Sequence, residues 1–145
     1  MSGDRERGRE MMRRVYGWDI EPTRAFEEAT VDHLFGRIWA DGDLPVRDRR
    51  LVLVGLAVGS GQLDVASLQL DAAIRLGELD ADDLRELVVF LAHYAGWPRA
   101  AALNSEVEDL LARHQRPADR PGASEAGDAD SASGTAPGPG SAARP

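Results

Sequence analysis

Cysteine and lysine are both missing from this chain of 145 residues. Without cysteine there is no disulfide, no thiolate ligand for zinc or an iron–sulfur cluster, and no thiol that reduces a peroxide. Without lysine there is no amine for Schiff-base chemistry or for a phosphate-binding loop, because all 17 basic side chains are arginine and stay protonated. His, Asp and Glu also show no metal-ligand spacing. We therefore expect no metal and no other cofactor.

Long apolar runs and an excess of basic residues are absent too. No run approaches the roughly 20 apolar residues that cross a bilayer. The charged start, MSGDRERGRE, has no apolar stretch behind it and does not resemble a signal peptide. A net charge of −8 disfavours nucleic-acid binding, which needs clustered basic side chains. The sequence thus predicts a cytoplasmic protein with neither a membrane nor a nucleic acid as its partner.

Aromatic residues make up only 6% of the chain, so its core must consist mainly of Leu, Val and Ala. Apolar side chains recur at helical spacing between glycine and proline interruptions, which predicts an all-α fold of about six helices. We expect a helical arm at 1–22, a helical domain at 23–115 and a disordered tail at 116–145, since residues 117–145 carry no large apolar side chain. The expected helices span 5–16, 23–39, 45–58, 63–76, 81–94 and 98–114.

Local signals mark several helix ends. Asp80 followed by Asp83 predicts an N-cap, while Gly77 and Gly96 predict left-handed residues at helix C-termini. The stretch LVLVGLAV, residues 51–58, is apolar on every side if it is helical. Such a helix must be covered all round, which is difficult in about 110 folded residues, so a partner subunit is expected.

Four motifs occur in the order of a known family. They are Phe-Gly-x-Ile-Trp at 35–39, Arg-x-Arg-x-Leu-Val at 47–52, the glycine-ended helix at 63–77, and Tyr-x-Gly-x-Pro at 94–98. Together they resemble the carboxymuconolactone decarboxylase family, which belongs with the alkylhydroperoxidase-D-like proteins. The resemblance implies a bundle built on a helical hairpin and a homo-oligomer, commonly a trimer or hexamer. It also implies a small-molecule substrate.

The family's reactive residues are replaced in this chain. Its decarboxylases carry a histidine where this sequence has Gln69 and a glutamate where it has Arg50. Its peroxidases need a Cys-x-x-Cys pair where residues 62–65 read QLDV. Glutamine forms hydrogen bonds but has no pKa near neutrality. A thiol peroxidase is therefore excluded, and a decarboxylase mechanism requires another proton carrier.

Other residues are candidates for that site. His93 and His33 are the candidate general bases, with a histidine bonded at a helix end and a surface or interface histidine as the respective alternatives. For substrate binding we consider arginines that would hold a carboxylate and side chains that would orient or enclose a ring. Arg49 matches an arginine of the family motif and has an ion pair as its alternative role. The substrate-binding candidates are Gln69, Arg49, Arg37, Trp39, Tyr94 and Trp97.

Two functions follow from these residues. The first is a cofactor-independent enzyme that decarboxylates, isomerises or rearranges a small carboxylated or polyketide-like ring compound by acid–base chemistry. The second is a non-catalytic family member that kept the oligomeric scaffold and a pocket as a ligand-binding or accessory subunit. The position of the histidines relative to the cavity beside Gln69 discriminates between them.

Overall fold

Every regular element of the computed structural model is a helix within residues 2–116, the part of the chain that the structure describes. The all-α prediction is confirmed. Apart from Arg116, the tail expected at 116–145 lies outside the described residues. The elements are α1 (Ser2–Tyr16), α2 (Ala25–Glu28), η1 (Ala29–Trp39), α3 (Val46–Ser60), α4 (Leu63–Arg75), α5 (Ala81–Ala95) and α6 (Trp97–Gln115).

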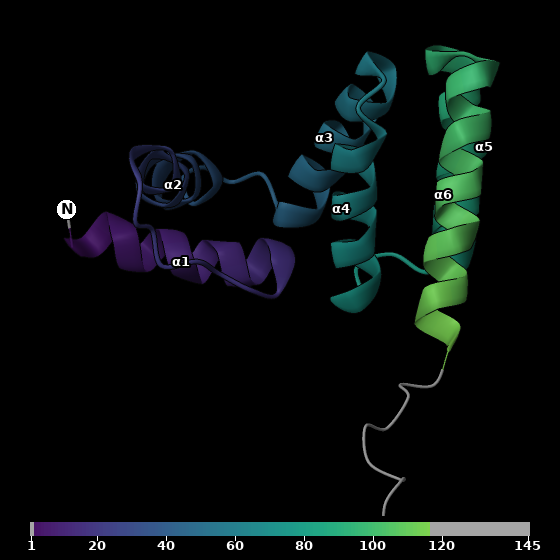
Figure 1. Ribbon diagram of the computed structural model, residues 1–145. Coiled ribbons are helices and arrows are strands. Elements are labelled where there is room, and N and C mark those ends of the chain that lie inside the picture. The colour runs from purple at the N-terminus through teal and green to yellow at the C-terminus, as the bar shows by residue number, and fades with distance from the viewer. Residues whose placement is uncertain (1, 117–145) are drawn as a thin grey trace, which may run out of the picture.

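The helices form two packed groups (Figure 1). Helices α3, α4, α5 and α6 share one apolar core, which includes Val54, Leu70, Leu84 and Leu103. Helix α1 packs against η1 around a second, smaller core. In Figure 1 this N-terminal pair lies on one side of α3 and α4, with α5 and α6 on the other side. The segment expected as a helical arm therefore packs on η1. The expected domain boundary at residue 22 stays a prediction.

The segment expected as one α-helix at 23–39 begins at Ala25 and becomes a π-helix from Ala29 onward. A π-helix has i to i+5 hydrogen bonds and therefore shifts the columns that an α-helical pattern predicts. Val31 and Phe35 are buried, whereas Phe26 and Ile38 are 83% and 54% exposed. The simple α-helical prediction was wrong in this respect, and the apolar column through Phe26 faces outward.

The apolar stretch at 51–58 is helical and belongs to α3. Its Val54 and Val58 are buried in the core, but Val52 and Leu56 are 67% and 64% exposed. One face of α3 is therefore not covered by the described part of the chain. A partner subunit over this face stays a prediction.

The helix caps predicted from the sequence are mostly confirmed. Asp80 accepts a hydrogen bond from the Asp83 amide at 2.9 Å, and the Asp83 carboxylate accepts one from the Asp80 amide at 3.1 Å, a capping box. Gly77 is left-handed at φ 70°. Gly96 was wrongly assigned, because its φ of 92° and ψ of 151° lie in the extended mirror region that glycine alone adopts readily.

Two glycines allow α1 and η1 to touch. A Cβ on Gly8 would lie 2.0 Å from the Val31 carbonyl oxygen, and a Cβ on Gly36 would lie 2.5 Å from the Asp4 carbonyl oxygen. Both neighbours are backbone atoms that cannot move independently. The glycine of the Phe-Gly-x-Ile-Trp motif is thus explained by this close helix crossing.

We predict that Gly36→Ala lowers the free energy of unfolding, because the added methyl group forces α1 away from η1. Overpacking of this kind costs about 1–3 kcal/mol. Urea unfolding would measure it. Gly55→Ala is the matched control in α3, where an added Cβ has nothing within 4 Å and the lower entropy of the unfolded chain favours folding. Equal stabilities for the two variants would contradict the close crossing.

Candidate functional site

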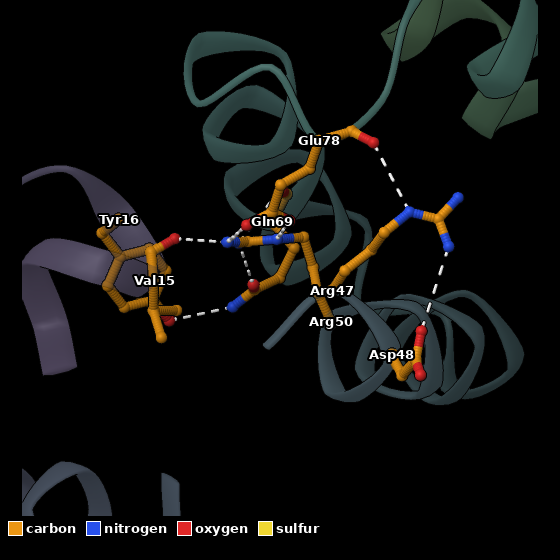
Figure 2. Close-up of polar contacts among 7 residues, drawn as sticks. All are labelled: Val15, Tyr16, Arg47, Asp48, Arg50, Gln69 and Glu78. Carbon is orange, nitrogen blue, oxygen red and sulfur yellow. Dashed lines mark hydrogen bonds and ion pairs between the residues drawn. The ribbon is translucent and has the colours of Figure 1, made fainter. Parts of the chain in front are cut away.

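A buried polar cluster joins the N-terminal helix pair to α3 and α4 (Figure 2). Arg50 of α3 and Gln69 of α4 are 0% and 1% exposed, and they are the buried polar residues among those described. Glu78 follows α4, and Tyr16 ends α1. These four side chains come from segments far apart in the sequence. Two of them, Arg50 and Gln69, occupy the positions at which the resemblance expects catalytic residues.

Arg50 uses every N–H group of its guanidinium. Nε donates to Glu78 Oε2 at 2.6 Å, and Nη2 donates to Glu78 Oε1 at 3.1 Å and to the Val15 carbonyl at 2.6 Å. Nη1 donates to Gln69 Oε1 at 2.8 Å and to the Gln69 carbonyl at 3.5 Å. The paired carboxylate and the full set of acceptors make burial of this charge tolerable. No N–H of Arg50 is left for a ligand.

The end of α4 brings Glu78 to Arg50. The Glu78 amide donates to the Ala73 carbonyl at 2.9 Å, and the Gly77 amide donates to the Ile74 carbonyl at 3.1 Å. This pattern and the left-handed Gly77 form a Schellman-type end, which reverses the chain immediately after the helix. The reversal returns the Glu78 carboxylate toward α3. A local glycine signal thus positions one member of the cluster.

Gln69 has a fixed orientation between Arg50 and Tyr16. Arginine has donors only, so the Gln69 atom that faces it must be the amide oxygen. The Gln69 amide nitrogen then donates to the Tyr16 hydroxyl oxygen at 2.9 Å. Tyr16 also stacks on Trp18 and meets Phe35 edge-on, with ring centroids 5.1 and 5.7 Å apart. The phenol is therefore held on both its ring and its hydroxyl group.

Burial raises the pKa of Tyr16 above its ordinary value near 10, and the hydrogen bond from Gln69 and the charge of Arg50 only partly offset this. Burial raises the pKa of a phenol because it disfavours the charged phenolate. At neutral pH Tyr16 is therefore a neutral hydroxyl group with a proton available for donation. It is a weaker acid than a solvated tyrosine.

An apolar groove of about 580 Å³ lies beside this cluster. Its walls come from the end of α1 and the following loop, from α2 and η1, and from α3 and α4. Aromatic and aliphatic side chains dominate, with Tyr16, Glu27, Thr30 and Arg49 as the polar exceptions. The apolar lining residues are Met12, Trp18, Ile20, Phe26, Leu34, Phe35, Trp39, Val52, Leu53, Leu56 and Leu68. The size and lining suit a small organic ligand.

A second hollow, of about 660 Å³, lies between α4 and α6 and is much more polar. Three of the four charged side chains that line it already have partners. Arg113 pairs with Glu106 at 3.2 Å, and Asp71 contacts both Arg75 at 2.8 Å and His114 at 2.9 Å. The contacts of Asp71 with His114 and of Ser67 with Glu106 connect α4 to α6, so we take the apolar groove as the candidate site.

Three of the predicted substrate-binding residues lie at or beside the groove. Trp39 lines it, and Gln69 lies behind Tyr16. Arg49 lines it as well, but its Nε donates to the Leu44 carbonyl at 3.0 Å, and Nη1 and Nη2 donate to the carbonyls of Ile38 and Asp41. These bonds cap the end of η1 and occupy much of the guanidinium that was expected to hold a carboxylate.

The other candidates lie elsewhere in the single chain. His93 is exposed near the end of α5, with Nδ1 2.9 Å from the Val89 carbonyl and its ring 5.9 Å from that of Trp97. Tyr94 and Trp97 are exposed beside it. On η1, His33 is exposed, and Arg37 pairs with Asp4 at 2.6 Å. None of these five residues lines the groove.

Sequence reasoning missed Tyr16, Glu78 and Glu27. One signal existed for Glu78, because an arginine in place of a buried glutamate needs a new acidic partner, and Glu78 follows a helix-ending glycine. Tyr16 was placed only on the apolar side of its helix. Its contact with Gln69, 53 residues away, has no local signature.

Residues 2–116 contain neither a metal-binding cluster of side chains nor a membrane-spanning helix. No set of three or more His, Asp and Glu side chains there is placed to hold a metal ion. No helix in that same part of the chain is long and apolar enough to span a bilayer.

Fold and site together define an all-helical protein with an apolar groove next to a buried Arg–Gln–Glu cluster. The model of the carboxymuconolactone decarboxylase family matches residues 24–109, more than half of the chain. The protein belongs to this family, which confirms the resemblance seen in its motifs. No curated protein and no solved structure gives a significant match.

We predict that Arg50→Met strongly destabilises the fold, because it leaves Glu78 and Gln69 without their donor. Removing one partner of a buried ion pair costs about 3–5 kcal/mol. Arg85→Met is the matched control, since the Arg85–Glu108 pair at 2.9 Å is on the surface. Urea unfolding should give a far smaller loss for Arg85→Met. Similar losses in both variants would argue against a special role for the cluster.

We further predict a pH effect from Tyr16. Its pKa is higher in the folded than in the unfolded chain, so its contribution to stability is present below about pH 10 and is lost as the pH rises through the folded pKa. Ultraviolet titration of tyrosinate in a Tyr94→Phe variant isolates Tyr16, because the chain has two tyrosines. The midpoint should lie above 10, and a midpoint at or below 10 would contradict the burial effect.

Proposed function

We propose that this protein is a ligand-binding member of its family that holds a small, mostly apolar molecule in the groove without proton-transfer chemistry. The supporting observation is the state of the two positions where the family's glutamate and histidine are expected. Arg50 donates hydrogen bonds to Gln69 and to Glu78, and arginine and glutamine side chains do not serve as general acids or bases. The inherited catalytic positions thus have a structural role behind the groove.

The titratable groups that line the groove also suit binding better than catalysis. Hydrogen bonds from the Thr23 amide and hydroxyl lower the pKa of Glu27, which makes its carboxylate a weaker base. Burial raises the pKa of Tyr16, which makes its phenol a weaker acid. Efficient general acids and bases have pKa values near the working pH, so both shifts go in the unhelpful direction.

A cofactor-independent acid–base enzyme remains the second candidate, because the protein belongs to a family named for a decarboxylase. That function needs a proton carrier at the groove. His33 and His93 do not line it in the single chain, so another subunit would have to bring one of them there. The exposed Val52 and Leu56 on α3 support our proposal that copies of this chain assemble, as a trimer or hexamer.

Tryptophan fluorescence provides the test of ligand binding. Trp18 and Trp39 line the groove and Trp97 does not, so a Trp97→Phe variant reports on the groove alone. Aromatic ketones, lactones, aromatic acids and keto acids would first be screened by thermal shift. We expect that ligands found in this way change the fluorescence and raise the unfolding temperature, because they bind the folded state only.

Two surface variants locate the binding. Leu34→Arg, on η1 and away from the proposed assembly face of α3, puts a charge at the groove and should weaken binding at least about tenfold, since a buried charge without a partner is costly. Val89→Arg is the control, because Val89 is also exposed, on α5, and lies outside the groove. Gel filtration of both variants checks that assembly is unchanged. Turnover of a bound ligand by the unmodified protein would overturn the non-catalytic proposal, and the absence of any binder would overturn ligand binding itself.

A further inference from the structure

The hydrogen bonds behind the groove run in one direction only. Arg50 carries donors alone, so it must donate to Gln69 Oε1. Gln69 can then present only its amide N–H groups to Tyr16, and it donates to the phenol oxygen at 2.9 Å. Because that oxygen already accepts from Gln69, the Tyr16 proton must point elsewhere. Among residues 2–116, the bond from Gln69 is the one hydrogen bond of the Tyr16 hydroxyl, and it leaves this proton unused.

Tyr16 is also a wall of the groove. Its ring is fixed by Trp18 and Phe35, so the hydroxyl oxygen cannot move away without losing these aromatic contacts. The raised pKa keeps the proton on the phenol at neutral pH. A hydroxyl donor held in this way in an apolar groove favours a ligand with an oxygen that accepts a hydrogen bond. A ligand without such an oxygen leaves the donor without a hydrogen bond, which costs binding free energy.

Charge at the groove selects the kind of oxygen. Hydrogen bonds from Thr23 keep Glu27 ionised, and Arg49 already donates to three backbone carbonyls. A ligand carboxylate would meet the like charge of Glu27, and Arg49, although still charged, already directs three of its N–H groups to backbone carbonyls. A neutral carbonyl oxygen avoids this repulsion and still accepts from Tyr16. A neutral ligand of this kind differs from the carboxylated substrate that Arg49 led us to expect from the sequence.

We infer that Tyr16, oriented by Gln69 and Arg50, is the specificity-determining hydrogen-bond donor of the groove, and that the ligand is a compact apolar molecule with a neutral carbonyl group, such as a ketone, ester or lactone. This inference rests on the proposed ligand-binding function. Gln69 and Arg50 are positioning residues in it, since neither contacts the ligand. Their role is to fix the direction in which the Tyr16 proton points.

The test uses three probes of one shape, 1-indanone, indane and indane-1-carboxylate, titrated into the full chain by calorimetry and tryptophan fluorescence. We expect 1-indanone to bind about tenfold more tightly than indane, which corresponds to one good hydrogen bond. The carboxylate should bind more weakly than the ketone. Glu27→Gln should reduce that difference, because the amide keeps the acceptor for Thr23 and removes the charge.

Two variants separate the donor from its orientation. Tyr16→Phe should make 1-indanone and indane bind equally, whereas Tyr94→Phe, at an exposed tyrosine on α5, should leave their ratio unchanged. Gln69→Glu keeps the phenol but replaces the amide donor with a carboxylate that accepts from both Arg50 and Tyr16. The Tyr16 proton should then turn inward, and the preference for the ketone should be lost as in Tyr16→Phe.

Infrared spectroscopy of bound 1-indanone gives a readout that does not depend on a variant's stability. A hydrogen bond from Tyr16 should move the carbonyl stretch below its position in an apolar solvent, and Gln69→Glu should reverse this shift. If indane binds as well as 1-indanone and the stretch does not move, the inference fails while the proposed function stands. If none of the three probes nor any screened compound binds, the proposed function itself fails.

Discussion

A guanidinium that is fully buried needs five acceptors, and Arg50 finds them on three separate parts of the chain. They are a carbonyl at the end of α1, the side chain and carbonyl of Gln69 on α4, and the carboxylate of Glu78 beyond α4. Each N–H group of Arg50 without an acceptor would cost part of the desolvation free energy of the buried charge. The five hydrogen bonds are therefore needed together. Arg50 therefore fixes α1 against α3 and α4, and the groove between these helices is shaped before any ligand arrives.

The same bonds change what the family's site can do. A glutamate and a histidine in contact can exchange protons near neutral pH, whereas an arginine and a glutamine cannot. The reversal of charge at position 50 is balanced by Glu78, so the buried pair is neutral overall. The remaining hydrogen bonds have a fixed direction, because Arg50 can only donate to Gln69 Oε1 and Gln69 can then only donate to Tyr16. Under our proposal, the groove uses this direction to recognise an oxygen atom of a ligand.

Features determined by neighbouring residues could be predicted from the sequence, and features determined by distant ones could not. The capping box of Asp80 and the left-handed Gly77 depend on residues within a few positions, and both were predicted. The bond from Arg50 to Val15 spans 35 residues and the ion pair with Glu78 spans 28. Periodicity carries no information about such pairs. The π-helical turns of η1 were also missed, because an apolar pattern with α-helical spacing fits a helix of either kind over a few turns.

Stability alone does not account for the cluster. A buried ion pair can often be replaced by well-packed apolar side chains with no loss of stability, or with a gain, because those side chains carry no desolvation cost. Leucine or methionine at positions 50, 69 and 78 would then hold α1 in place equally well. Apolar side chains could not, however, fix the orientation of the Gln69 amide or direct the proton of Tyr16. We therefore interpret the five hydrogen bonds of Arg50 as a way of fixing the direction of the Tyr16 hydroxyl proton at the wall of the groove.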